Sequence, residues 1–206
     1  FDLERIEILR GPQGTSYGLD SSGGSVIMRT AKVDLENFGY KVRAGLTEVN
    51  DVDGNGYTLG GVVNLPLIEN VLGLWFSFLQ EENPGYGEVA TRADIDNPTE
   101  FTRDSFRVKA FWAVTDALDL EVTHSEWNTD YNFLPGTQIR DSSSGTMVLN
   151  PLTTGMLLEL FPDGELENDF EIAWTTFLAK YSFSFAELTY SAGRVDTPKK
   201  ETNSEF

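Results

Sequence analysis

The sequence predicts an all-β fold: a partial transmembrane β-barrel of about seven antiparallel, up-and-down strands. Three observations lead to this prediction. Apolar and polar residues alternate with period two in a series of short stretches. The connections between these stretches are alternately short and long. No apolar run approaches the length of a transmembrane helix, and alternating barrel strands would leave no such run.

The first unit, residues 2–32, is predicted to be a pair of short strands. An alternating run at residues 6–10 stops at Gly11-Pro12, and a second run at residues 25–30 follows Gly23-Gly24. The Gly-rich stretch between the two runs indicates tight turns. Because the unit has little apolar content of its own, we expect it to lie against a larger structure.

The order ERIEILRGPQGTSYG, followed by SSGGSVIMRTAK, resembles the C-terminal end of the plug domain of TonB-dependent outer-membrane receptors. The positions that match the family motif are Glu4, Arg5, Ile6, Glu7, Leu9, Arg10, Gly11, Pro12, Gly14, Tyr17, Gly18, Gly23, Gly24 and Thr30. Ser16 departs from the motif, where a larger apolar residue is common, and Leu19-Asp20 is an unusual filling of the turn. The motif covers only the first unit, but many matches in fixed order are more specific than one short motif.

The resemblance implies that residues 1–33 are the last segment of an N-terminal plug domain and that residues 34–206 begin the barrel. It implies TonB-dependent active transport of a scarce solute (a ferric siderophore, haem, cobalamin or an oligosaccharide) across the outer membrane of a Gram-negative bacterium. The implied partners are the solute, outer-membrane lipid and the TonB energy-transducing complex, whose contact box is not in this sequence. Both ends of the sequence look cut, so we expect a fragment of a longer protein.

The stretches predicted to form barrel strands are residues 38–48, 57–67, 71–81, 104–114, 118–128, 171–183 and 186–196. In the first of them, Tyr40 and Val42 alternate with Lys41 and Arg43. This pattern is typical of a strand with lipid or core on one side and water on the other.

Connection lengths give the main argument that does not depend on the resemblance. The connections at residues 83–102 and 130–169, after the third and fifth predicted strands, are far longer than hairpin loops, whereas those after the second, fourth and sixth strands are short. Transmembrane barrels show this alternation, with short periplasmic turns and long outer loops. The alternative, a soluble or surface β-sandwich that binds carbohydrate, need not alternate its loops. Residues 151–162 are dense in apolar side chains and either form a lid over ligand or pack the loop onto its neighbours.

The formal net charge is −18, from 33 acidic and 15 basic side chains. A nucleic-acid-binding protein needs a basic face, so we expect no nucleic-acid partner. Two interpretations stay open: acidic loops in contact with water, or a negative field that favours cationic or metal-bearing ligands. The chain has no cysteine, which excludes disulfides and thiolate metal sites.

We predict no enzyme and no catalytic, cofactor-binding or metal-binding residues. The Gly-rich stretch lacks the Lys-Ser/Thr pair of a phosphate loop, and Pro12 removes an amide donor. Asp51–Gly56 matches the start of a calcium loop, but Val62 stands where the bidentate acid belongs. We interpret it as a hairpin turn and leave a weak cation site open. His124 and Glu126 are predicted to be a polar pair facing the lumen, without a third ligand.

The resemblance gives a structural and gating role to ten motif residues: Arg5, Glu7, Arg10, Gly11, Pro12, Gly14, Tyr17, Gly18, Gly23 and Gly24. In the family, charged plug residues pair with acidic residues of the inner barrel wall. We therefore expect Arg5 and Arg10 to meet one of Asp119, Glu121 and Glu187. The alternative is that both arginines are surrounded by water in a wet lumen. The ligand-binding residues are left unassigned.

Overall fold

The computed structural model describes residues 2–11, 23–49, 54–85, 100–132, 138–140, 147–149 and 167–197. The regular elements in these ranges are all β-strands. No helix in the described part of the chain has the length and apolar content needed to cross a bilayer.

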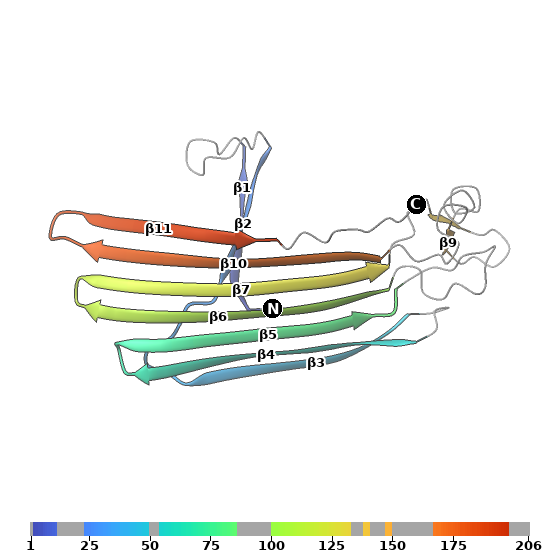
Figure 1. The fold of residues 1–206 in the computed structure, drawn as a ribbon, viewed down its shortest axis with the longest axis horizontal. Helices are drawn as coiled ribbons and strands as arrows, with labels where there is room; N and C mark the ends of the chain where they lie inside the picture. Colours follow the sequence, from blue (N-terminus) through green and yellow to red (C-terminus); the bar gives the residue numbers. More distant parts are fainter. Residues whose placement is uncertain are drawn as a thin grey trace.

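The strands follow one another in space almost in chain order (Figure 1). Their bounds are β1 Leu3–Arg10, β2 Gly24–Thr30, β3 Gly39–Glu48, β4 Asn55–Ile68, β5 Leu72–Asn83, β6 Phe101–Thr115, β7 Leu118–Asn132, β8 Gln138–Arg140, β9 Met147–Leu149, β10 Glu167–Ser182 and β11 Glu187–Asp196. A seven-stranded sheet has the order β11-β10-β7-β6-β5-β4-β3, and all of its pairings are antiparallel. The predicted all-β, up-and-down architecture is thus confirmed.

The central strands are longer than the alternation of side chains predicts. Strands β6 and β7 have 15 residues each and β10 has 16, and they extend past the predicted ranges at the end that carries the long connections. A tilted barrel strand needs only about 9–11 residues to cross a bilayer. The surplus residues are mostly polar, with Phe101 and Phe170 as exceptions, and backbone pairing continues through them. The short pair β8–β9 lies in the connection 130–169, where the sequence predicted no strand.

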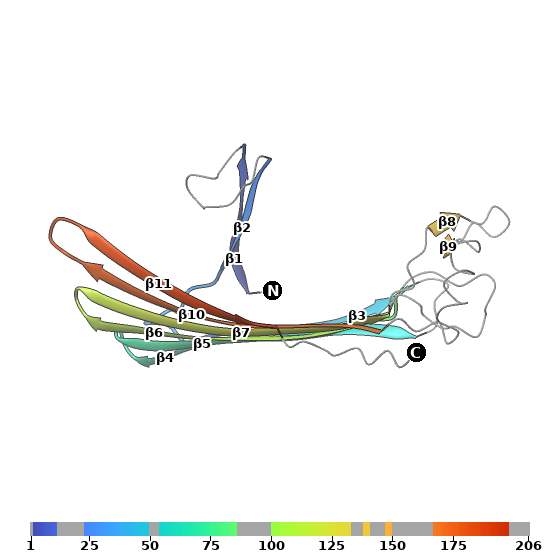
Figure 2. The same ribbon diagram turned by 45° about the horizontal axis from the view of Figure 1, so that its top comes forward.

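The hairpin β1–β2 stands away from one face of the curved sheet (Figure 2). We call this face the inner face and the opposite one the outer face. The most buried side chains of the sheet alternate on the inner face and are nearly all polar: Val62, Asn64, Ser77, Lys109, Thr123 and Ser125. Large apolar side chains such as Leu46, which is 90% exposed, occupy the outer face.

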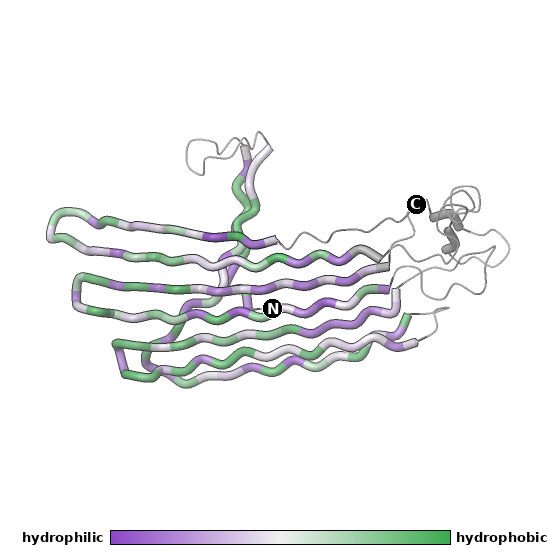
Figure 3. Tube along the Cα trace, in the orientation of Figure 1, coloured by the Kyte–Doolittle hydropathy of each residue, from purple (hydrophilic) through white to green (hydrophobic). Residues whose placement is uncertain are grey.

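This distribution is the reverse of that in a soluble protein. Among the described residues, Val62 is the only buried large hydrophobic side chain, whereas five polar ones are buried. A β-sandwich would pack its apolar faces together, so the pattern is that of a barrel wall with a polar interior. Apolar residues gather toward the short-turn end of the strands and polar residues toward the other end (Figure 3). The outer face therefore carries an apolar belt with a polar extension beyond it.

Candidate functional site: the contact between the hairpin and the inner face

The root of the hairpin is joined to the sheet by a buried ion pair. Asp2 lies directly before β1, and Nη1 of Arg107 on β6 donates to both of its carboxylate oxygens at 2.5 Å. Nε of Arg107 donates to Oγ of Ser125 at 2.9 Å, and Oγ of Ser77 donates to Asp2 at 3.1 Å. Strands β5, β6 and β7 therefore each contribute one side chain to this contact.

Burial and charge act on Asp2 in opposite directions. Burial alone would raise the pKa of the Asp2 carboxyl, but hydrogen bonding and Coulombic attraction from Arg107 outweigh it, and the pKa lies below its ordinary value. The side chains of Arg107 and Asp2 are only 19% and 11% exposed. Removing either partner would leave a largely buried charge without compensation, which is costly.

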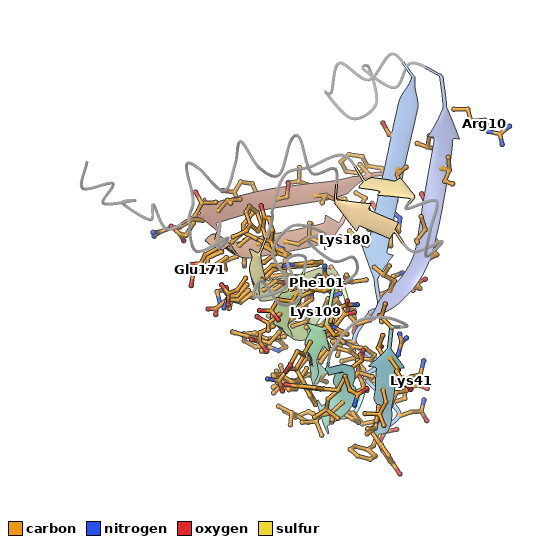
Figure 4. All side chains as sticks on the ribbon, turned by 90° about the vertical axis from the view of Figure 1, so that its right-hand side faces the viewer. Arg10, Lys41, Phe101, Lys109, Glu171 and Lys180 are labelled. Atoms are coloured by element: carbon orange, nitrogen blue, oxygen red, sulfur yellow. The ribbon has the colours of Figure 1, made fainter. Side chains whose placement is uncertain are left out.

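A second cation fixes the end of β2. Nζ of Lys109 donates to Oγ1 of Thr30 and to the carbonyl oxygen of Ala31, both at 2.6 Å. Lys109 is only 5% exposed and lies on the side of the sheet that faces the hairpin (Figure 4). The amide of Ala31 donates to the carbonyl oxygen of Asp2 at 2.8 Å. This bond joins the segment that Arg107 contacts, before β1, to the segment that Lys109 contacts, after β2. We call the set Asp2, Ser77, Arg107, Lys109 and Ser125 the clamp.

The connection from the hairpin to β3 is fixed by Asn64 on the inner face of β4. Its Nδ2 donates to the carbonyl oxygens of Asp34 at 2.8 Å and Asn37 at 2.7 Å, and its Oδ1 accepts from the amide of Asp34 at 3.0 Å. The Asp34 carboxylate accepts hydrogen bonds from the amides of Glu36 and Asn37, which lower its pKa. These five hydrogen bonds all join a short side chain to a backbone group, so the connection is closely held.

Gly73 on β5 leaves room for this connection. A Cβ atom at Gly73 would lie 2.7 Å from Cγ1 of Val33 and 3.1 Å from Cδ2 of Leu35. These apolar side chains therefore pack directly on the backbone of the sheet. The connection is held by both polar and apolar contacts.

The motif charges lie elsewhere than predicted. Arg5 pairs with Glu4 at 2.8 Å and with Glu7 at 2.6 Å, and Glu7 also accepts from Arg29 at 2.9 Å. Arg10 lies at the far end of the hairpin, away from the sheet (Figure 4).

The expected ion pairs between plug arginines and wall acids are therefore not found among the described residues. Register places Asp119, Glu121 and Glu187 on the inner face, as expected. Glu187, however, pairs with Lys180 of β10 at 2.8 Å. The polarity of the contact is the opposite of the prediction, because the hairpin supplies the acid and the sheet supplies the bases.

Two motif glycines have backbone conformations that require glycine. Gly11 has φ +86° and Gly24 has φ +131°, and a Cβ at Gly24 would lie 2.3 Å from the carbonyl oxygen of Leu9. A Cβ at Gly23 would meet nothing within 4 Å. Four other motif positions, Pro12, Gly14, Tyr17 and Gly18, lie outside the described residues.

The remaining sequence predictions have mixed outcomes. His124 and Glu126 are bonded at 3.1 Å, but they lie on the outer face, so the prediction that they face the lumen is wrong. The described residues contain no group of three or more His, Cys, Asp or Glu side chains placed to hold a metal ion. Residues 51–53 of the predicted turn and all of residues 151–162 lie outside the described residues.

An aromatic ledge lies on the inner face near the long connections. The guanidinium of Arg103 is 5.1 Å from the ring centroid of Phe101 and 5.2 Å from that of Trp127, and its Nη1 donates to Glu81 at 3.0 Å. We call these four residues the ledge. Nε of Arg103 and Nε1 of Trp75 are buried without a partner among the described residues. Such groups are normally satisfied by water, ligand or further protein.

The sequence signal for these residues is weak. Arg107 and Lys109 alternate with Phe106 and Val108, which places them on the polar face of their strand. Nothing in the local sequence shows that Asp2, more than a hundred residues away, lies opposite them. Only the register of the sheet and the path of the connection bring the partners together.

The sequence matches no family model. The siderophore receptor PirA from Acinetobacter baumannii is similar in structure, with a TM-score of 0.67, 17% sequence identity, and coverage of 94% of this chain and 26% of the receptor chain. A mutant of the ferric enterobactin receptor PfeA from Pseudomonas aeruginosa has a TM-score of 0.61 at 16% identity, covering 94% of this chain and 28% of the receptor.

The chain thus spans about a quarter of the length of the solved structures that it matches. Its fold is similar to that of part of these two receptors, and this similarity agrees with the resemblance of residues 2–32 to the plug segment of TonB-dependent receptors. Both matched proteins are named as receptors.

Proposed function

We propose that this chain is part of a TonB-dependent transporter that takes up a scarce solute across the outer membrane of a Gram-negative bacterium. In this proposal residues 1–33 are the last segment of the plug and residues 34–206 are the first part of the barrel. The observation that supports it best is a hairpin fastened by polar contacts to the inner face of a sheet whose outer face carries an apolar belt.

The chemistry of the clamp suits a gate. Its bonds are ion pairs and hydrogen bonds, and water can replace them one at a time when the plug rearranges. An apolar contact of the same size would have to expose its whole area to water at once. The hairpin can therefore be held firmly at rest and still be released by work delivered from the TonB complex.

The ledge is proposed to contact the incoming solute. It lies on the inner face near the strand ends that carry the long connections, and the guanidinium of its arginine contacts two aromatic rings. Rigid aromatic and arginine side chains bind ligands at low entropic cost. The names of the two matched receptors favour a ferric siderophore as the first solute to test, ahead of haem, cobalamin and oligosaccharides.

Uptake by cells tests the proposal. A strain that lacks the full-length gene is complemented with it, and accumulation of ⁵⁵Fe supplied with a panel of siderophores is measured with and without functional TonB. We expect accumulation for at least one siderophore, dependent on both genes, and heat-modifiable gel mobility of the extracted protein. TonB-independent accumulation would contradict the proposal, as would recovery of the protein in a detergent-free soluble fraction.

A further inference from the structure

The outer face carries a pocket that transport does not explain. It has a volume of about 260 Å³ and lies on β5, β6 and β7. The side chains that carry the inference are Phe78, Gln80, Asp104, Phe106, Glu126 and Asn128. Register places all six on the outer face, opposite to the clamp. We call this cavity the outer pocket.

The pocket is built from two neighbouring rows of cross-strand partners. Gln80, Asp104 and Asn128 stand directly opposite one another across the three strands. The next row toward the apolar belt is formed by Phe78, Phe106 and Glu126. Paired side chains on one face of a sheet lie within contact distance. One side of the pocket is therefore amide and carboxylate, and the other side is largely phenyl.

The polar row is free to bind a ligand. Gln80, Asp104 and Asn128 make no hydrogen bond or ion pair with any other described residue, whereas Glu126 accepts from His124 at 3.1 Å. Together the row offers two amide donor groups and several acceptor oxygens in one line. These groups stand beside an apolar belt, where fewer water molecules compete for them than at an ordinary protein surface.

The charge of the pocket excludes anionic ligands. Two carboxylates and no lysine or arginine line it, so a phosphate or sulfate group would be repelled. No trio of acidic or histidine side chains among the described residues is placed to hold a cation. The amides, carboxylates and phenyl rings that line the pocket match an uncharged molecule with many hydroxyl groups and an apolar ring face. A hexose fits this description, because its hydroxyls bind amides and carboxylates while its C–H face packs on aromatic rings.

The position of the pocket indicates where such a sugar would come from. Along the outer face of β5, Leu74, Phe76 and Phe78 are followed by Gln80 and Glu82, so the pocket lies where the apolar belt gives way to the polar extension. A headgroup at this level is attached to acyl chains that run along the belt. We propose that the outer pocket binds the sugar headgroup of an uncharged glycolipid in the surrounding membrane. The proposal rests on the proposed membrane position of the sheet, but not on the solute or on TonB.

Binding is tested with the purified full-length protein in nanodiscs. The nanodiscs contain phosphatidylcholine with a minor fraction of either monohexosyl diacylglycerol or phosphatidylglycerol, and bound lipid is counted by native mass spectrometry. We expect retention of the glycolipid over phosphatidylglycerol by about tenfold or more, as for a site with several matched hydrogen bonds. Equal retention of the two lipids would overturn the proposal.

Variants separate the pocket from general lipid contact. Asp104→Leu and the double change Gln80→Leu with Asn128→Leu should abolish the preference, while Glu171→Gln, on the outer face of β10 and outside the pocket, should keep it. Unchanged preference in both pocket variants would overturn the proposal. Heat-modifiable mobility verifies that each variant is folded. Siderophore uptake by the pocket variants should remain normal, so a failure here is distinguishable from a failure of the transport proposal.

A free sugar distinguishes the two sources of the ligand. Methyl hexoside added at millimolar concentration should not displace the glycolipid, because the acyl chains on the belt add to its affinity. Tight binding of the free sugar in nanodiscs that contain phosphatidylcholine alone would show a site for a soluble saccharide and overturn the assignment to a membrane lipid.

Discussion

The guanidinium of Arg107 and the carboxylate of Asp2 are 105 residues apart in the chain, yet they are in direct contact at 2.5 Å. Ser125 orients the guanidinium and Ser77 supplies a further hydrogen bond to the carboxylate. One ion pair thus links the start of the hairpin to the middle of the sheet. In the proposed transporter this link sets how firmly the plug is seated.

Arg107→Ala should loosen the hairpin. The change leaves the Asp2 carboxylate largely buried without its partner, at a cost of about 2–3 kcal/mol. In the full-length protein we expect increased passive entry of a bulky antibiotic that the intact outer membrane excludes. Arg10→Ala is the matched control, since Arg10 lies at the far end of the hairpin. Normal exclusion by Arg107→Ala at equal surface expression would show that the ion pair does not seat the plug.

Lys109→Met should expose the end of β2. Methionine keeps the aliphatic length but removes the two hydrogen bonds to Thr30 and Ala31, worth about 1.5–3 kcal/mol each when the donor is charged. We expect faster hydrogen exchange of the Ala31 amide, which bonds to Asp2. Lys41→Met removes a lysine from the inner face of β3 and should leave this exchange unchanged. Equal protection of the Ala31 amide in both variants would mean that Lys109 does not hold the end of β2 against the sheet.

The clamp should weaken in acid. The pKa of Asp2 in the folded protein lies below its ordinary value of 3.8, so its ionisation stabilises the contact at pH values above 3.8. This stabilisation is lost as the pH falls through the lower, folded-state pKa. Hydrogen exchange at residues 2–11 should therefore accelerate at the acid end of a pH series after correction for intrinsic rates. Asp2→Asn should remove that pH dependence, and a variant that keeps it would assign the effect to another carboxyl.

Gly24→Ala should destabilise the hairpin. Gly24 has φ +131° and a Cβ there would meet the Leu9 carbonyl oxygen at 2.3 Å, so the backbone must shift at a cost of about 1–3 kcal/mol. Gly23→Ala is the neighbouring control, because a Cβ at Gly23 meets nothing within 4 Å. Protease cleavage of residues 2–32 in the native protein measures the difference. Equal cleavage rates in the two variants would contradict the strain argument.

The sequence predicted the sheet because alternation is a local property. Tyr40 and Val42 against Lys41 and Arg43 are enough to identify a strand with two unlike faces. Strand ends were less accurate, since the polar extensions of β6, β7 and β10 are held by backbone pairing that leaves no apolar pattern. The prediction for His124 is wrong because a polar pair does not by itself identify the lumen side, and Val122, on the same face of β7, marks that face as the apolar one.

The contacts of the clamp could not be predicted from the sequence, for a different reason. Arg5 and Arg10 carry charge in the recognised motif, and a partner on the wall was the natural expectation. Arg5 instead satisfies its charge within two residues, on Glu4 and Glu7. Ion pairs between near neighbours in the sequence do not depend on how strands are paired. The contact between Asp2 and Arg107 depends on the path of the connection and on four strand pairings, β1–β2, β3–β4, β4–β5 and β5–β6.

The contacts of the clamp with the hairpin also determine how the chain responds to tension. Leu3 pairs with Thr30, so the start of β1 and the end of β2 lie together, and an antiparallel pair pulled apart there opens one residue pair at a time. A pull applied at Asp2 meets Arg107 before it meets any bond of the hairpin. Residues 34–37 stay tied to Asn64 on the other side. Under load the hairpin would therefore unzip from Asp2 and remain tethered to the wall, ready to fold back when the force ends.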